Sequence, residues 1–272
     1  MKLRACLAAL LFGCLCAVLA HGQVVVTGYT ETGNLPANDD GSSSAIDLGF
    51  TINFGGGIYT QTFVSNNGYI TFNSGSGNYS PESLNSEYSG QPIIAAFFSD
   101  VDTRGPNSGI VSWGTALVDD NLAFVVKWDR VGEYYYEDNP TASNTFEIVL
   151  VSRADVGTGN FDVYFNYGSM NWDHSASNDY GASIGFHSGT NGTPVYYQVP
   201  GSGTPGAFLD GGMTSLNNAT NTGAAGLLTF VARDGGFETV AEITPIPEPS
   251  TYALLALGLA VIGFTVRRRR KA

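Results

Sequence analysis

The sequence predicts an all-β protein, an antiparallel β-sandwich of about a dozen short strands, followed by a single C-terminal membrane helix. The 272 residues include 35 glycines, and clusters of Gly, Asn, Asp and Pro separate short apolar segments at close intervals, as is typical of sandwiches. No segment between the two ends shows a sustained helical period. Two sheets closed over one core would bury the apolar face of every strand, although a barrel would do the same.

Two segments give the clearest strands. Ile46–Phe54 has apolar residues at every second position, which is typical of a strand with one face in water. Ile93–Phe98 is an uninterrupted apolar run, typical of a strand buried on both faces, and we expect the domain to be arranged around it. Further strands are expected at residues 24–26, 59–65, 69–73, 110–118, 122–128, 146–151, 161–167, 182–186, 195–199 and 227–231.

Two hairpins are expected from their turn residues. Asn66-Asn67-Gly68 lies between two of these strands, and its Asn-Gly pair is typical of a type I′ turn, in which both central residues have positive φ. Asp119-Asp120-Asn121 joins the next pair of strands along the chain by another tight turn.

Residues 1–20 have the features of a secretory signal peptide. Lys2 and Arg4 precede the apolar run at 5–20, and the small residues Val18 and Ala20 suit a cleavage site. All three cysteines of the chain lie inside this segment, at Cys6, Cys14 and Cys16. We therefore expect the exported chain to contain no thiol and no disulfide, so that packing alone stabilises its core.

Charge is distributed very unevenly. Of the twelve basic residues, two lie in the signal peptide and five lie at 267–271, which leaves five against 24 acidic residues in the rest of the chain. Such an acidic body repels phosphate backbones, so the sequence excludes nucleic acid as a partner.

Four segments carry a family resemblance. They are residues 64–72 (Val-Ser-Asn-Asn-Gly-Tyr-Ile-Thr-Phe), 92–104, 144–150 and 165–168. In this order and spacing they resemble the nidogen-like (NIDO) extracellular domain, to which we assign residues 23–235. The resemblance implies a β domain of secreted, matrix or adhesive proteins, and it implies no enzymatic activity.

Asp100 and Asp102 form a candidate calcium site at the end of the central apolar strand. Carboxylates at i and i+2, with loop carbonyls nearby, place several oxygens on one side of a turn, and oxygen is the ligand that Ca²⁺ prefers. The full EF-hand pattern is missing. The alternative is that the two carboxylates accept hydrogen bonds from the turn or pair with Arg104.

Catalytic alternatives are weak. Gly181-Ala182-Ser183-Ile184-Gly185 matches the nucleophile-elbow pattern of hydrolases, but Ser183 falls in an expected strand rather than at a strand-to-helix turn. A glycosidase would need two carboxylates across a sugar cleft, and nothing in the sequence singles out such a pair.

Two further groups of side chains could be considered for sugar or metal binding. Tyr134, Tyr135 and Tyr136, followed by Glu137 and Asp138, could stack on a sugar, or could form a loop with one Tyr packed inward. His174 and His187 cannot complete a His or Cys metal set without cysteines.

The C-terminal tail has three parts. Pro247, Glu248 and Pro249 are followed by an apolar segment at 252–266 and then by Arg267, Arg268, Arg269, Arg270 and Lys271. This tail resembles a PEP-CTERM sorting signal over residues 247–272, with 236–246 as a linker before it. The resemblance implies a Gram-negative host, an exosortase-type processing enzyme, transient residence in the inner membrane and delivery to the cell surface or extracellular matrix. A plain membrane anchor is the alternative.

Two classes of function follow from these patterns. The first is a non-catalytic surface or matrix protein whose β domain serves adhesion or binds polysaccharide or proteins of a biofilm matrix. The second is a secreted hydrolase acting on extracellular polysaccharide. We favour the first, with no certain cofactor and calcium as the only candidate.

Overall fold

The computed structural model describes residues 28–134, 142–174, 179–190, 193–212 and 214–245, all within one compact unit, His21–Ile246. Several predictions lie outside these residues: the signal peptide 1–20, the strand at 24–26, the cluster from Tyr135 to Asp138, the sorting motif and the membrane segment with its Arg cluster. The described part is all-β and contains no helix, so none of it forms a helix that could span a membrane.

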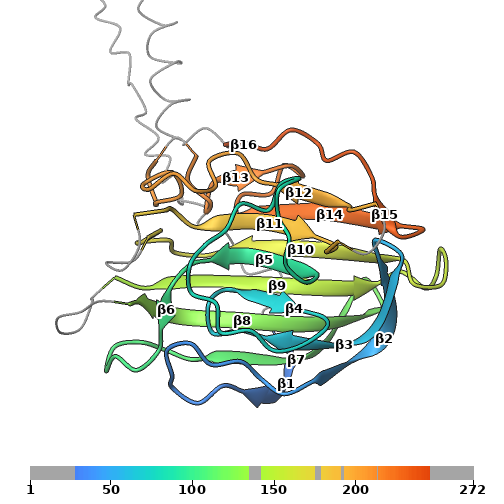
Figure 1. Ribbon diagram of the computed structural model, residues 1–272, viewed down its shortest axis with the longest axis horizontal. Helices are drawn as coiled ribbons and strands as arrows, with labels where there is room; N and C mark the ends of the chain where they lie inside the picture. The colour runs from blue at the N-terminus through green and yellow to red at the C-terminus, as the bar shows by residue number, and fades with distance from the viewer. Residues whose placement is uncertain (1–27, 135–141, 175–178, 191–192, 213, 246–272) are drawn as a thin grey trace, which may run out of the picture. The chain divides into compact units, whose positions relative to one another are not determined.

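The larger sheet contains ten strands (Figure 1). Their order is β1 (Thr30–Asn34), β7 (Val111–Val118), β8 (Asn121–Glu133), β9 (Asn144–Ser152), β10 (Phe161–Tyr167), β14 (Leu227–Arg233), β13 (Ala219–Thr220) and β16 (Thr244–Pro245). Two short strands extend it, with β15 (Gly236–Phe237) on β14 and β6 (Val101–Asp102) on β8. The prediction of purely antiparallel pairing is wrong at one place, because β13 pairs with β14 in parallel.

The smaller sheet contains six strands, in the order β12 (Tyr196–Gln198), β11 (Ser183–His187), β5 (Ile93–Phe98), β4 (Tyr69–Thr71), β3 (Gly57–Val64) and β2 (Ile46–Phe54). All six residues of β5 are buried. One face of β5 looks toward the larger sheet, and the other is covered by the connection from β4 to β5, which contributes Leu84 and Tyr88. The prediction of a central strand buried on both faces is thus confirmed.

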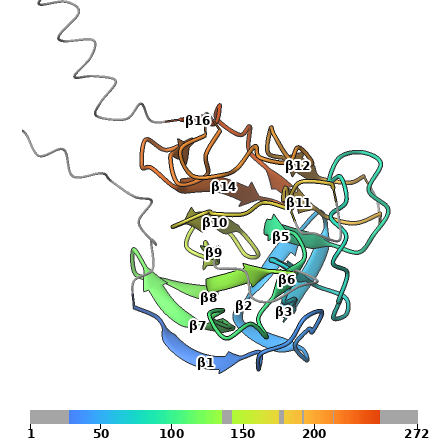
Figure 2. The ribbon, with the colours of Figure 1, turned by 90° about the vertical axis from the view of Figure 1, so that its left-hand side faces the viewer.

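The two sheets share one core, and Figure 2 shows them from the side. Aromatic rings make contacts from sheet to sheet: Phe97 of β5 lies 5.2 Å from Phe146 of β9, and Phe54 of β2 lies 6.4 Å from Phe161 of β10, measured between ring centroids. Aromatic pairs of this kind stabilise a core beyond the area that they bury. Since no disulfide joins the described strands, this packing holds the layers together.

The two predicted hairpins form, but the turn at 66–68 does not have the predicted type. In the turn at 66–68 only Gly68 has positive φ (+83°), so the turn is not type I′. It is a three-residue connection that ends on a left-handed glycine. At the other hairpin Asp119 and Asp120 have φ of +48° and +64°, and Val118 pairs with Asn121. The type I′ backbone therefore occurs where the sequence has no Asn-Gly pair.

The segment predicted as a linker, 236–246, is packed on the body as far as it is described. Phe237 stacks on Phe186 with ring centroids 3.9 Å apart. Val240 and Ile243 are half-buried against the core, and Thr244–Pro245 forms β16. The folded body therefore extends at least to Pro245 rather than ending at 235.

Candidate functional site

The turn at 66–68 is buried beneath the loops that connect the sheets. Asn66 and Asn67 are both fully buried, and the indole N–H of Trp128 on β8 donates to the Asn66 carbonyl at 2.9 Å. Asn67 uses both ends of its amide: Oδ1 accepts from Val101 N at 2.9 Å, and Nδ2 donates to Asp40 Oδ1 at 2.9 Å. Because buried polar groups must be hydrogen-bonded, these contacts fix the turn against both neighbouring loops.

Hydrogen bonds in the same region join the loop at 38–41 to Thr103, directly after β6. The Thr103 hydroxyl accepts from Asn38 N and donates to Asn38 O, each at 2.8 Å. The side chain of Asn38 in turn accepts from Gly41 N at 2.6 Å. Two segments about sixty residues apart in sequence are therefore held side by side, which brings their acidic residues together.

Asp39, Asp40 and Asp100 form what we call the acidic cluster. Each offers a carboxylate oxygen, and these oxygens lie within 4.8 Å of one another. Asp100 is buried, Asp39 is half-buried and Asp40 is exposed, so the cluster opens to the surface on one side. Carboxylate oxygens at such spacing can hold a hard cation such as Ca²⁺.

Asp102, the other predicted calcium ligand, faces a guanidinium instead. Its carboxylate accepts from Arg104 Nη2 at 2.7 Å and from Arg104 Nε at 2.9 Å, which is a bidentate pair. Arg104 Nη2 also lies 2.9 Å from Asp39 Oδ2. The structure therefore places Asp100 in a group of carboxylates and gives Asp102 the ion pair that was the alternative from sequence.

The electrostatics of the acidic cluster are unfavourable in the absence of a cation. Burial, followed by the charges of Asp40 and Asp102, raises the pKa of Asp39 to about 6, although Arg104 acts in the opposite direction. Asp39 Oδ1 is buried and accepts no hydrogen bond. A bound cation would offset this repulsion, and it would compete with a proton for Asp39.

Sequence reasoning missed Asp39 and Asp40. Both lie in a polar stretch with no strand pattern, and Asp100 is sixty residues further along the chain. The Asp39-Asp40-Gly41 sequence indicates a turn, but nothing local indicates that this turn packs against residues 100–103.

The residues considered for catalysis are structural where they are described. Ser183 is fully buried at the start of β11, opposite Phe98, and not at a strand-to-helix turn. Asp173 is buried and accepts from Gly206 N at 2.9 Å and Phe208 N at 3.0 Å, so it holds a loop in place while also contacting exposed His174.

His187 and Tyr134 also make contacts within the folded body. His187 is fully buried between Tyr88 and Tyr196, and its Nδ1 accepts from Gly189 N at 3.0 Å. Burial lowers its pKa, which keeps the ring neutral. Tyr134 donates its backbone N–H to Asp100 O at 2.9 Å; the rest of the predicted tyrosine cluster lies outside the described residues.

A groove of about 220 Å³ lies beside β14 in the described body. Asn221, Thr222, Thr229, Glu238 and Thr239 provide its polar groups. It contains one carboxylate, whereas a glycosidase needs a pair. The groove therefore gives no support to the hydrolase alternative.

Two packed sheets and a buried Asn-Asn-Gly turn make up the described body, which is the β domain that the family resemblance implies. A family model described as NIDO related matches residues 21–231, and the chain belongs to this family. A second model, the PEP-CTERM protein-sorting motif, matches residues 245–270. Both resemblances drawn from the sequence are thus confirmed.

Curated relatives share the domain within much longer proteins. Human alpha-tectorin is 29% identical over 221 residues, which cover 72% of this chain and 10% of the relative. Drosophila melanogaster nidogen is 26% identical over 220 residues, which cover 70% of this chain and 15% of the relative. The chain therefore spans a small part of these relatives. No solved structure matches.

Proposed function

We propose that this chain is a non-catalytic surface or extracellular-matrix protein of a Gram-negative bacterium, sorted by its C-terminal tail and using its NIDO-related domain for adhesion or for binding polysaccharide or matrix proteins. The observation that carries the proposal is the presence of both modules on one chain, at residues 21–231 and 245–270. The first occurs in extracellular proteins, and the second is a sorting motif that implies processing by an exosortase.

The tail suits a transient stop in the inner membrane. Residues 252–266 would span about 22 Å as a helix, which is short of the roughly 30 Å hydrocarbon core. Arg267–Arg270 and Lys271 can extend to the headgroups, and by the positive-inside rule they keep that end in the cytoplasm. Pro247, Glu248 and Pro249 then lie outside the membrane on the side of the body, where a membrane-embedded enzyme reaches them.

Sorting is tested in a host that carries the processing enzyme. We expect the mature protein to lack residues 252–272 by mass spectrometry and to be found at the surface or in the matrix. Glu248→Ala, or neutralisation of Arg267–Arg270, should leave the precursor in the inner membrane. An intact C-terminus on matrix-associated protein would contradict the proposal and favour a plain anchor.

Binding is tested with the exported chain on glycan and matrix-protein arrays, with and without calcium. Reaction products are analysed in parallel by mass spectrometry. Saturable binding without turnover supports the proposal, whereas shortened glycans would favour the hydrolase.

Calcium binding is a second proposal, favoured by the cluster of Asp39, Asp40 and Asp100. Extracellular calcium sites bind at about 0.1–1 mM, so a ten-fold excess would raise the free energy of unfolding by about 1.4 kcal/mol. We expect millimolar calcium to raise the melting temperature, and Asp39→Asn with Asp100→Asn to abolish the rise. Asp102→Asn, which removes the partner of Arg104 instead, should keep it. Identical melts in calcium and in chelator would exclude the site.

A further inference from the structure

The last described segment of the body, residues 236–245, has a firmly packed beginning. We call this segment the terminal strap. Phe237 stacks on Phe186 at 3.9 Å and meets the rings of Phe54 and Phe161 at 6.0 and 5.9 Å. Glu238 N donates to Val231 O at 2.9 Å, in continuation of the pairing between β15 and β14. These contacts join the beginning of the strap to the core.

The remainder of the strap, residues 239–245, is held more weakly. Its strand β16 pairs with β13 through only two residue pairs, Ala219 with Pro245 and Thr220 with Thr244. Both residues of β16 are exposed, and proline has no N–H to donate. A two-residue pair at the edge of a sheet contributes little stability.

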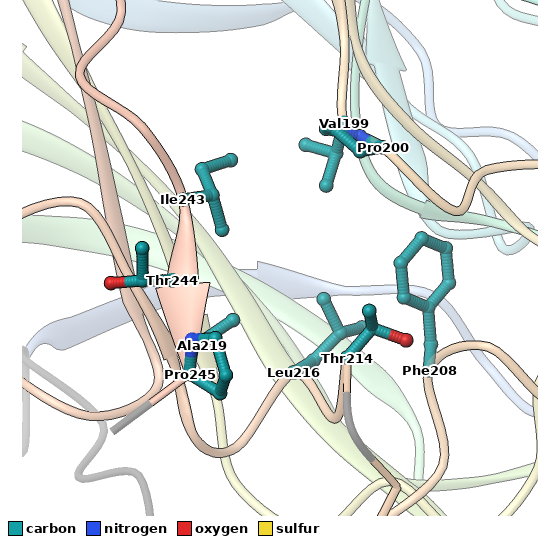
Figure 3. A pocket seen from close by; sticks show the side chains of 9 residues that line it. All are labelled: Val199, Pro200, Phe208, Thr214, Leu216, Ala219, Ile243, Thr244 and Pro245. Carbon is teal, nitrogen blue, oxygen red and sulfur yellow. The ribbon is translucent and has the colours of Figure 1, made fainter. Parts of the chain in front are cut away.

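Two hollows lie along this part of the strap, although its Val240 and Ile243 are half-buried against the core. The groove of about 220 Å³ is lined both by residues 238–241 and by Thr229–Val231 of β14. Ile243 and Pro245 line an apolar pocket of about 60 Å³, with Phe208 on its other side (Figure 3). Atoms that face a void lose the dispersion contacts of a packed core, so release of residues 239–245 costs less than release of Phe237.

The sorting motif begins immediately after the strap. The match to the motif starts at Pro245, the last residue of β16, and Pro247 follows two residues later. Two residues reach at most about 7 Å. While the strap is docked, the motif therefore stays within about 7 Å of the end of the body. This distance is short compared with the radius of gyration of a folded body of about 220 residues, which is about 17 Å.

We infer that residues 239–245 detach from the body when the sorting motif is processed, and that they serve as the spacer between the folded domain and the processing enzyme. This inference rests on the proposed function. Seven extended residues add about 24 Å of reach, which is comparable to the dimensions of the body. The stack of Phe237 on Phe186 keeps the domain folded meanwhile, because it lies before the released residues.

A disulfide that locks the strap tests the inference. Ala219 and Pro245 are direct partners in an antiparallel pair and line the same pocket. Such partners have Cα atoms about 4.5–5.5 Å apart, within the range that a disulfide bridges. Since the only native cysteines lie at positions 6, 14 and 16, the double variant Ala219→Cys with Pro245→Cys introduces one defined pair in the exported chain.

Processing of the full chain is followed by pulse-chase in a host with the processing enzyme. We expect the oxidised double variant to lose its tail at least several-fold more slowly than wild type, and reductant to restore the rate. The two single variants should be processed like wild type and should melt like it, which controls for folding. Eight Gly and Ser residues inserted after Ile246 should restore processing of the locked variant without reductant.

Processing of the oxidised, disulfide-bonded variant at the wild-type rate would overturn the inference. Failure of the inserted spacer to restore the locked variant would also overturn it, because distance would then not be the limit. If the wild-type chain were never processed, and so behaved like the Glu248→Ala variant, the proposed function itself would be overturned.

Discussion

Two hairpin turns of this protein have similar sequence signals and opposite surroundings. The turn at 66–68 is buried, and its side chains and carbonyls bond to Trp128, Val101 and Asp40. The turn at 119–120 stands at the end of β7 and β8, where Asn121 Nδ2 donates to Asp119 O in an exposed bond. The difference shows that a turn motif specifies a reversal of the chain, while long-range contacts decide whether that turn organises a site.

The strongest test of this comparison is Gly68→Ala. A Cβ at this position would lie 1.7 Å from the Phe97 carbonyl oxygen, on a backbone with φ of +83°. Left-handed backbone costs about 1–2 kcal/mol and overpacking another 1–3 kcal/mol, so we expect a loss of about 3 kcal/mol or more in chemical denaturation. Gly56→Ala is the control: its φ is +85°, with nothing within 4 Å of the added atom. Equal losses in both variants would mean that the close approach to Phe97 does not matter.

The side-chain bonds of the two turns give the next largest difference. Asn67→Ala leaves the buried Val101 N–H without its acceptor, and an unsatisfied buried group costs about 1–3 kcal/mol. Asn121→Ala removes only an exposed bond, and surface changes are usually within about 0.5 kcal/mol. Both are measured by urea denaturation. Similar values for the two variants would contradict the role assigned to burial.

The same contrast explains what the sequence could predict. Alternation at Ile46–Phe54 and the apolar run at Ile93–Phe98 depend on neighbours within a few residues, and both strands formed as expected. The Asn-Gly pair predicted a hairpin correctly and its turn type wrongly, because Asn66 and Asn67 bond to groups as far away in the sequence as Asp39 and Trp128, at 27 and 62 residues. Those partners, and not local preference, set the backbone of this turn.

For the same reason, the sequence predicts only part of the candidate site. Asp100 follows the central strand and stands out in the sequence, whereas Asp39 and Asp40 join it only through the contact of Asn38 with Thr103. The sequence predicts a linker where the terminal strap lies, because its one large apolar anchor, Phe237, follows two glycines and continues no periodic pattern. Its stacking partner, Phe186, is fifty-one residues earlier in the chain.

A smaller effect is expected from pH at the acidic cluster that the buried turn supports. The unfolded pKa of an Asp is about 3.9, and the folded pKa of Asp39 is about 6 because of burial and neighbouring carboxylates. Folded protein therefore binds the proton more tightly, and the contribution of Asp39 to stability is lost as pH rises from about 4 to about 6.

Asp39→Asn removes this dependence. In chelator, the melting temperature of the variant should rise relative to that of wild type between pH 4 and pH 7. Asp120→Asn, which removes one carboxylate from the exposed turn, controls for the change in net charge. A constant difference between Asp39→Asn and wild type across this range would contradict the raised pKa.

The smallest effect belongs to the backbone of the exposed turn. Asp120 has φ of +64°, a conformation that Asp tolerates and that Gly adopts without steric cost. Gly also loses more entropy on folding, by roughly 0.5–1 kcal/mol, so the net gain from Asp120→Gly should be only about 0.5 kcal/mol, or a rise of one or two degrees in melting temperature. Asp120→Val places a β-branched residue at the same φ and should lower the melting temperature by more than that. Because no described side-chain bond of Asp120 is lost in either variant, the pair measures the backbone alone. If both variants had the melting temperature of wild type, the type I′ geometry would contribute nothing to the stability of this hairpin. The contrast with the buried turn would then rest entirely on the bonds of Asn66 and Asn67.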